Sequence, residues 1–135
     1  DEAIIKYQPK KVFIYCGEND IADVDTLSPA TVFNRFKTLH TILLTKLPKA
    51  TKIVFVSLKP SIARWHLESK FMEANQLIQA YIATQKNIQY LDVHALMLDE
   101  NKEVLKDIFI ADKLHLNPKG YLIWQKAFAP YLISQ

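Results

Sequence analysis

Cysteine is almost absent from the sequence, and this scarcity limits what the protein can be. Cys16 is the single cysteine, so an internal disulfide and a Cys-rich zinc site are both excluded. It follows an apolar run, where a small buried side chain is the simplest interpretation. No apolar stretch reaches the roughly 18 residues that span a bilayer, and no signal peptide is visible. The sequence therefore predicts neither a disulfide-stapled domain nor a transmembrane one.

An excess of charge of one sign is also lacking. The 17 basic and 14 acidic residues leave a formal net charge of +3, and the densest basic cluster is only Lys10-Lys11. No basic block or arm indicates a nucleic-acid partner, and no basic amphipathic helix indicates a membrane surface. Half of the 135 residues are apolar, which is enough for the core of one domain. We expect a single globular domain without a nucleic-acid partner.

Strand-like and helix-like patterns alternate along the chain. Three continuous apolar runs predict strands that are covered on both faces, and Ser28-Pro29 and Asn117-Pro118 are typical helix starts. The connections are long enough for parallel pairing with right-handed crossovers. The sequence predicts a three-layer α/β/α domain with a parallel sheet. The expected strands are 11–16, 52–58 and 88–93, and the expected helices are 29–47, 68–84 and 118 onwards. The apolar face expected for the last helix consists of Tyr121, Leu122, Trp124, Phe128 and Leu132.

Three shorter segments have weaker patterns. Residues 1–9 have the pattern of the last turns of a helix that Pro9 stops. Residues 94–98 and 103–109 are short helical candidates between the third strand and the last helix.

Polar residues with chemical potential follow the predicted strands. In an open parallel sheet, sites form beyond the carboxyl ends of the strands, which selects the loops 17–27, 58–67 and 94–117. The chain has two glycines, Gly17 and Gly120, and they fall in the polar stretches 15–25 and 112–121. These stretches are the first places to look for a site.

The stretch Gly-Glu-Asn-Asp at 17–20 has two interpretations. Glycine, asparagine and aspartate are common turn residues, so a simple turn explains it. Alternatively, the Asn19 amide at a strand end can donate a hydrogen bond to a developing oxyanion. Gly17 would then let the backbone turn sharply beside a substrate.

Asp112 and His115 form a D-x-x-H pattern just before the last helix. A carboxylate three residues before an imidazole can accept the proton on Nδ1, which leaves Nε2 free to act as a general base. The alternative is a helix-entry loop in which both side chains are solvated.

Together, the two patterns resemble the SGNH (also called GDSL) hydrolase superfamily of serine esterases and lipases. The resemblance runs from Lys10 to the end of the chain, and "YCGENDI", "SLKPSIARW" and "LHLNPKGY" are similar to platelet-activating-factor acetylhydrolase-like and lysophospholipase-like members. It implies a flavodoxin-like parallel α/β fold. It also implies an oxyanion hole at Asn19 and Gly17, and the acid and base of a catalytic triad at Asp112 and His115.

The nucleophile block of this family is missing from the sequence. Neither Gly-Asp-Ser nor G-x-S-x-G occurs, and Ser57 and Ser61 have no adjacent glycine to form an exposed turn. We therefore interpret residues 1–135 as the C-terminal two thirds of one hydrolase domain. An upstream segment would carry the first strands and the serine. Without it, the strand at 11–16 would have an open edge, and the chain alone would be inactive and poorly stable.

The resemblance implies hydrolysis of a carboxylic ester, such as a short-chain or acetyl ester of a lipid or sugar, without a cofactor. Two alternatives remain open, namely a catalytically inactive lipid- or carbohydrate-binding module and a metal-dependent phosphoesterase. Arg64 and Trp65 lie in the second loop, either as a substrate wall or with Trp65 covering the core. His40, His66 and His94 are scattered, so no metal site is expected. Family members are often exported, which favours a periplasmic or secreted location.

Overall fold

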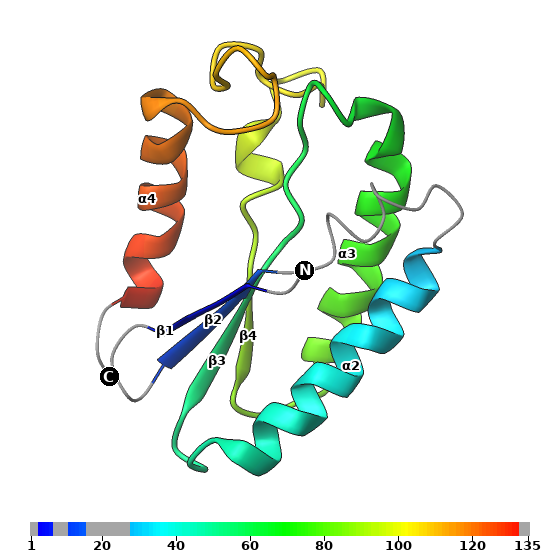
Figure 1. Cartoon of the computed structure of the whole chain (residues 1–135), viewed down its shortest axis with the longest axis vertical. Helices are drawn as coiled ribbons and strands as arrows, with labels where there is room; N and C mark the ends of the chain where they lie inside the picture. Colours follow the sequence, from blue (N-terminus) through cyan, green and yellow to red (C-terminus); the bar gives the residue numbers. More distant parts are fainter. Residues whose placement is uncertain (1–2, 7–10, 16–27, 133–135) are drawn as a thin grey trace.

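In the part of the chain that the structure describes, four strands form one sheet that lies between two layers of helix (Figure 1). The structure is a computed structural model and describes residues 3–6, 11–15 and 28–132. The strand order is β1-β2-β3-β4, so every strand pairs with its neighbour in the sequence. The strands are β1 (Ala3–Lys6), β2 (Lys11–Tyr15), β3 (Lys52–Val56) and β4 (Ile88–Leu91).

Strands β2, β3 and β4 are parallel, as the sequence predicts. Ile53 of β3 is in register with Val12 on one side and with Ile88 on the other. The strands end slightly earlier than the apolar runs, but the pairing continues, because the Ser57 N–H donates to the Leu91 carbonyl at 2.9 Å. The carboxyl ends of the three strands therefore lie at one edge of the sheet, where the candidate loops begin.

The prediction of a helix end at residues 1–9 is wrong for the described part of that segment. Residues 3–6 form β1, which pairs with β2 in antiparallel register, with Ile4 opposite Ile14. Two consecutive isoleucines favour an extended backbone, and the free edge of β2 supplies hydrogen-bond partners for it. The expected open edge on β2 is therefore covered by this strand.

Three long helices of the described residues pack on the sheet at or near their predicted bounds. They are α2 (Pro29–Lys46), α3 (Glu68–Ile82) and α4 (Pro118–Leu132). Helices α2 and α3 cover one face and α4 covers the other, which confirms the three layers (Figure 1). The Ser28 side chain caps α2 by accepting the Thr31 N–H at 3.1 Å.

The core lies on both sides of β3. Ile53 and Phe55 point toward α2 and α3, and Val54 and Val56 point toward α4, since side chains alternate along a strand. On the α2/α3 side they join the buried residues Val12, Ile14, Phe36, Leu39, Leu43, Ile78, Ile82 and Ile88. On the α4 side they join Phe13, Leu91 and Val93.

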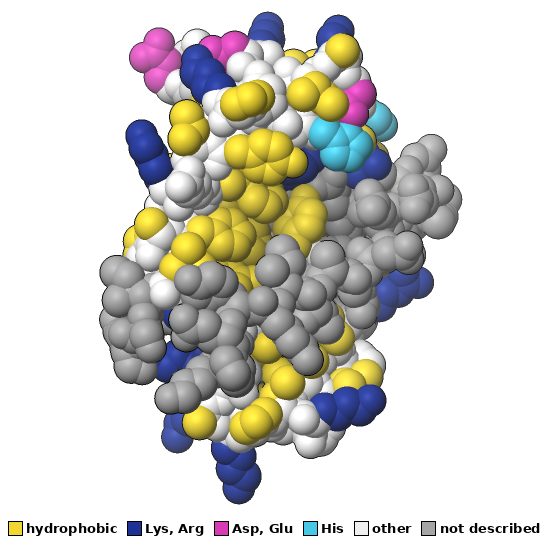
Figure 2. Space-filling model, turned by 60° about the vertical axis from the view of Figure 1, so that its left-hand side comes forward, with side chains coloured by type: hydrophobic (Ala, Val, Ile, Leu, Met, Phe, Trp, Pro, Cys, Tyr) yellow, Lys and Arg dark blue, Asp and Glu magenta, His cyan; other side chains and the backbone are white. Residues whose placement is uncertain are grey.

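Helix α4 covers its face of the sheet only partly. Trp124, Phe128 and Leu132 pack on the sheet but remain half-exposed, and Figure 2 shows hydrophobic side chains at the surface of this side. The prediction that Tyr121 and Leu122 belong to the apolar face of this helix is wrong, because they are 60% and 55% exposed. A single helix presents one stripe, which reaches too little of the sheet to bury every apolar residue it carries.

The segment between β4 and α4 is mostly irregular. A short 3₁₀ helix, η2 (Ala95–Met97), confirms the first helical candidate. The second candidate, 103–109, is not helical, because Val104 and Phe109 make isolated β-bridges with Leu98 and Leu116. Their buried side chains join Met97 and Ile108 in a separate core cluster. No helix in the described ranges is long and apolar enough to cross a membrane.

Gly120 allows the start of α4 to approach this irregular segment. A Cβ at this position would lie 2.5 Å from the Ile108 carbonyl oxygen and 2.8 Å from Leu116 Cδ2. The first contact is with backbone, which cannot swing away as a flexible side chain would.

We expect Gly120→Ala to destabilise the protein by about 1–3 kcal/mol through overpacking. The sign of this change in unfolding free energy tests the close approach, because the same substitution in an open helix interior stabilises the protein by roughly 1 kcal/mol. Urea denaturation measures the free energy of unfolding, with Lys126→Ala on the exposed face of α4 as the control. Equal or greater stability of Gly120→Ala would contradict the close approach.

Candidate active site

A tight loop places the Asp112 carboxylate against the His115 ring. Asp112 Oδ2 lies 2.5 Å from His115 Nδ1, and Asp112 Oδ1 accepts the N–H groups of Leu114 and His115, each at 2.9 Å. Both side chains reach solvent, with exposed fractions of 69% for His115 and 42% for Asp112. The carboxylate therefore holds the ring by one nitrogen while the ring itself stays accessible.

The hydrogen bonds to Asp112 keep its carboxyl ionised. The bond to the His115 side chain is the largest cause, and the backbone N–H groups of His115 and Leu114 add to it. Together they lower the pKa of Asp112 from 3.8 to about 2. At neutral pH the loop thus presents a carboxylate that accepts from the imidazole.

The loop rests against the residues that follow β3. The Ala63 N–H donates to the Lys113 carbonyl, and the Lys59 ammonium donates to the Leu114 carbonyl, both at 3.0 Å. Lys113, whose carbonyl accepts the first of these bonds, has a φ of 60°, in the left-handed region that few non-glycine residues adopt. Loops from two neighbouring strands thus meet at the carboxyl edge of the sheet.

The end of the loop is fixed by the start of α4. Asn117 caps the helix, since its Oδ1 accepts the Gly120 N–H at 2.9 Å, as the Asn-Pro pattern predicts. Its Nδ2 also donates to the Asp107 carbonyl at 2.9 Å.

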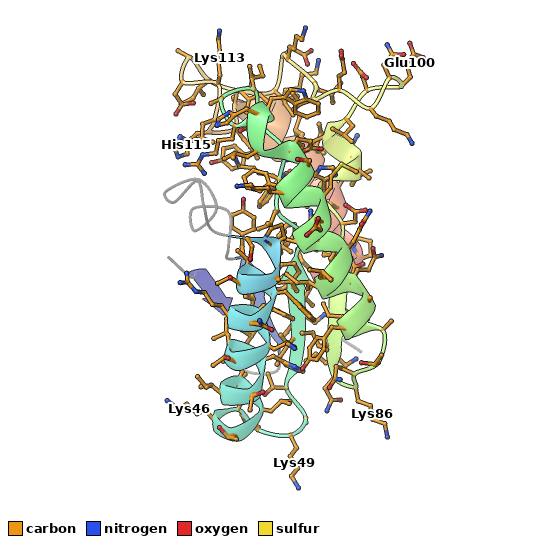
Figure 3. The ribbon with its side chains drawn as sticks, turned by 90° about the vertical axis from the view of Figure 1, so that its right-hand side faces the viewer. Lys46, Lys49, Lys86, Glu100, Lys113 and His115 are labelled. Atoms are coloured by element: carbon orange, nitrogen blue, oxygen red, sulfur yellow. The ribbon has the colours of Figure 1, made fainter. Side chains whose placement is uncertain are left out.

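The loop that carries His115 lies at one end of the molecule. Figure 3 shows His115 at this end, far from Lys46, Lys49 and Lys86 at the other.

The two serines after β3 have structural contacts. Ser57 is fully buried, and its Oγ accepts the N–H groups of Val93 and His94 at 3.0 and 3.1 Å. Ser61 is also buried, and its Oγ accepts the Arg64 N–H at 3.1 Å. Neither hydroxyl is accessible to a substrate in this arrangement.

The other candidate residues of this loop have mixed positions. Trp65 is partly buried and packs against the cluster around Met97. This position agrees with the interpretation that Trp65 covers the core. Arg64 is half-buried in the same loop, close to the Ala63 contact with the His115 loop. Contact of either side chain with a substrate stays a prediction.

The remaining histidines lie apart from one another. His40 is buried in α2, with Nδ1 2.8 Å from the Tyr81 hydroxyl, and His94 Nε2 lies 2.7 Å from Glu68 Oε2. His66 is exposed in the short 3₁₀ helix η1 (Trp65–Leu67) that follows β3. Among the described residues, no group of three or more His, Cys, Asp or Glu side chains could hold a metal ion.

The predicted oxyanion residues lie outside the described residues. Asn19 and Gly17, together with Cys16, fall in the range 16–27. The described chain reaches Tyr15 at the end of β2, whose ring packs edge-on against Trp124 at 5.6 Å between centroids. The predicted meeting of Asn19 and His115 therefore stays a prediction.

Sequence reasoning missed Lys59. This lysine is only 8% exposed although it is charged, and it contacts the loop that carries His115. Its position was a usable signal, since a lone lysine between Leu58 and Pro60 directly follows the central strand. Its contact with the Leu114 carbonyl could not be identified from the sequence, because the two residues are 55 positions apart.

Comparison with known proteins assigns the chain to a family. Residues 2–123 match the profile of the GDSL-like Lipase/Acylhydrolase family, and the chain belongs to this family. This agrees with the resemblance that the G-x-N-D and D-x-x-H patterns carry. A search of curated protein sequences found no match.

Solved structures share the fold at low sequence identity. A proposed platelet activating factor from Streptococcus pneumonia has a TM-score of 0.77 and 22% identity over 92% of this chain and 60% of its own. A carbohydrate esterase of family 3 from Talaromyces cellulolyticus has a TM-score of 0.73 and 15% identity, over 91% of this chain and 56% of its own. A GDSL-like lipase from Bacteroides thetaiotaomicron has a TM-score of 0.69 and 20% identity, over 89% of this chain and 60% of its own. The chain thus spans less than two thirds of the length of these proteins.

The Asp112–His115 contact makes a prediction about pH. Because the folded-state pKa of Asp112 lies below 3.8, its stabilising hydrogen bonds are fully present above that pH and are lost as the pH falls through about 2. In His115→Ala, the largest cause is removed, so the pKa of Asp112 should rise toward 3.8.

Titration of the carboxyl carbons by NMR measures this pKa. Asp107 is the internal control, because its pKa is lowered by Lys119 and should not respond to His115→Ala. An Asp112 that titrates identically in both proteins would contradict the contact.

Proposed function

We propose that this chain is the C-terminal two thirds of a hydrolase domain that cleaves carboxylic esters, with Asp112 and His115 as acid and base of its catalytic triad. The observation that carries the proposal is the 2.5 Å contact between Asp112 Oδ2 and His115 Nδ1 on an exposed ring. Membership in the GDSL-like Lipase/Acylhydrolase family supports the same reaction class.

The proposed reaction begins with a serine hydroxyl from an upstream segment of the same protein. This hydroxyl attacks the ester carbonyl while His115 takes its proton. Asp112 already engages Nδ1, so Nε2 is the ring nitrogen that acts as base and later protonates the leaving alcohol. The ionised carboxylate also stabilises the imidazolium formed at that step.

Asn19 and Gly17 are proposed for the oxyanion hole. They follow β2, and the carboxyl ends of β2, β3 and β4 share the sheet edge beside which the His115 loop rests. An amide donor at that edge would stabilise the negative oxygen of the tetrahedral intermediate, and no metal or cofactor is required for this step.

The proposed substrate is a short-chain or acetyl ester of a lipid or sugar. Support comes from the fold, which is shared with a carbohydrate esterase and a GDSL-like lipase. Arg64 and Trp65 are candidates for substrate contact, because their loop touches the His115 loop through Ala63.

The first experiment measures hydrolysis of p-nitrophenyl acetate by the full-length protein. His115→Ala should remove turnover, and Asp112→Asn should lower kcat by about 10²–10⁴-fold because the ring loses its charged partner. Asp107→Asn, another exposed carboxylate near this loop, is the matched control and should keep full activity. Retained turnover in His115→Ala would exclude the assigned base. Absence of hydrolysis from the unmodified protein would favour a binding module.

A second prediction concerns Asn19. In the same assay, Asn19→Ala should lower kcat by about 10²–10³-fold with little change in stability, because it removes one oxyanion donor. Steady-state kinetics give kcat, and thermal unfolding gives the stability. An unchanged kcat would reject the oxyanion role for this residue.

A further inference from the structure

The loop that carries His115 is anchored at its ends but exposed between them. Phe109 and Leu116 are buried in the cluster around Met97. Of the six residues between them, five are exposed and only Leu114 is half-buried. Apolar packing therefore fixes both ends of the loop, and the segment between them needs hydrogen bonds to hold its shape.

The Asp112–His115 contact cannot supply this anchoring. Both partners belong to the same loop, so their hydrogen bond orients the ring relative to the loop and not relative to the sheet. The hydrogen bonds from Asp112 to the N–H groups of Leu114 and His115 are likewise internal. A loop that is rigid within itself can still shift as a unit relative to a reacting group held elsewhere.

Two hydrogen bonds join the exposed segment to the residues after β3. The Ala63 N–H donates to the Lys113 carbonyl, and Lys59 Nζ donates to the Leu114 carbonyl, each at 3.0 Å. The two carbonyls are consecutive, and the second belongs to the peptide that enters His115. Lys113 carries a φ of 60°, so these bonds hold a backbone turn that is unfavourable by itself.

Lys59 is suited to this task by its burial. It is 8% exposed, and a buried ammonium is costly unless it is well hydrogen-bonded, so the Leu114 carbonyl contact is strongly favoured. Its backbone directly follows Leu58, whose N–H and C=O are both bonded to the buried Asn75 side chain at 2.9 and 3.2 Å. The ammonium thus reaches the loop from backbone that the Asn75 side chain of α3 fixes just beyond the end of β3.

We infer that Lys59 is a positioning residue, whose ammonium sets the place of His115 relative to the carboxyl ends of the strands. The inference rests on the proposed hydrolase function, and it adds a residue that acts on the reaction only through His115. Without the ammonium, the Leu114 carbonyl loses this donor and the peptide before His115 can rotate. The ring would keep its bond to Asp112 and lose its alignment with the substrate.

The test compares Lys59→Met, which keeps the length of the side chain without the donor, with Lys59→Arg, which keeps a cationic donor. Lys106→Met, at an exposed position of the same irregular segment, is the control. Amide hydrogen exchange of Leu114 and His115 reports loop order, and buried amides of α3, such as that of Ile78, report global stability. Hydrolysis by the full-length protein gives kcat and KM separately.

Lys59→Met should speed exchange at Leu114 and His115 by about tenfold and leave the α3 amides unchanged. It should also lower kcat by about tenfold or more at constant KM, because a displaced base weakens the stabilisation of the transition state and not the binding of substrate. Lys59→Arg should restore most of the exchange protection and most of kcat, and Lys106→Met should change neither. If Lys59→Met does not fold, Lys59→Gln replaces it as an uncharged and shorter side chain.

Unchanged exchange at Leu114 and His115 in Lys59→Met would overturn the inference. So would equal acceleration in α3, which would make Lys59 a general stability residue. If the unmodified full-length protein hydrolyses no ester, the hydrolase proposal fails, and the exchange measurement still decides whether Lys59 orders this loop.

Discussion

Burial of β3 on both faces is the constraint on which the rest of the structure depends. Phe55 points toward α2 and α3 and Val54 toward α4, so one strand of five residues joins the two halves of the core. A strand buried on both faces must have all of its backbone groups paired, which places β2 and β4 on its two sides. The residues that follow it then emerge at the centre of the carboxyl edge, and there they meet the loop before α4.

The candidate site is a product of this meeting and not of the D-x-x-H loop alone. Asp112 orders its own loop through contacts with His115 and with two backbone N–H groups. Lys59 and the Ala63 backbone then connect the loop to the central strand. The proposed acid–base pair and the contacts that place it thus lie in two segments that are some fifty residues apart in the chain. A hydrolase needs both, since proton transfer depends on the ring nitrogen and on its distance from the reacting group.

The sequence predictions were accurate where an element depends on residues close together in the chain, and wrong where it depends on distant ones. Helix starts at Ser28-Pro29 and Asn117-Pro118 were confirmed, because caps depend on residues three positions apart. The three parallel strands were recognised from runs of apolar residues. Residues 103–109 were wrongly predicted as helical, because their β-bridges depend on distant partners. The exposure of Tyr121 and Leu122 was also missed, since it depends on how far one helix reaches across the sheet.

The sequence by itself determined the fold class, the family and the Asp112–His115 pair. Each of these depends on local order: apolar period, capping residues, and a carboxylate three positions before an imidazole. Only the tertiary structure decided that residues 3–6 form an antiparallel edge strand, that Ser57 and Ser61 are buried, and that Lys59 contacts the loop of His115. The reason is physical, because burial and long-range hydrogen bonds depend on which surfaces meet, and no short window of sequence contains both surfaces.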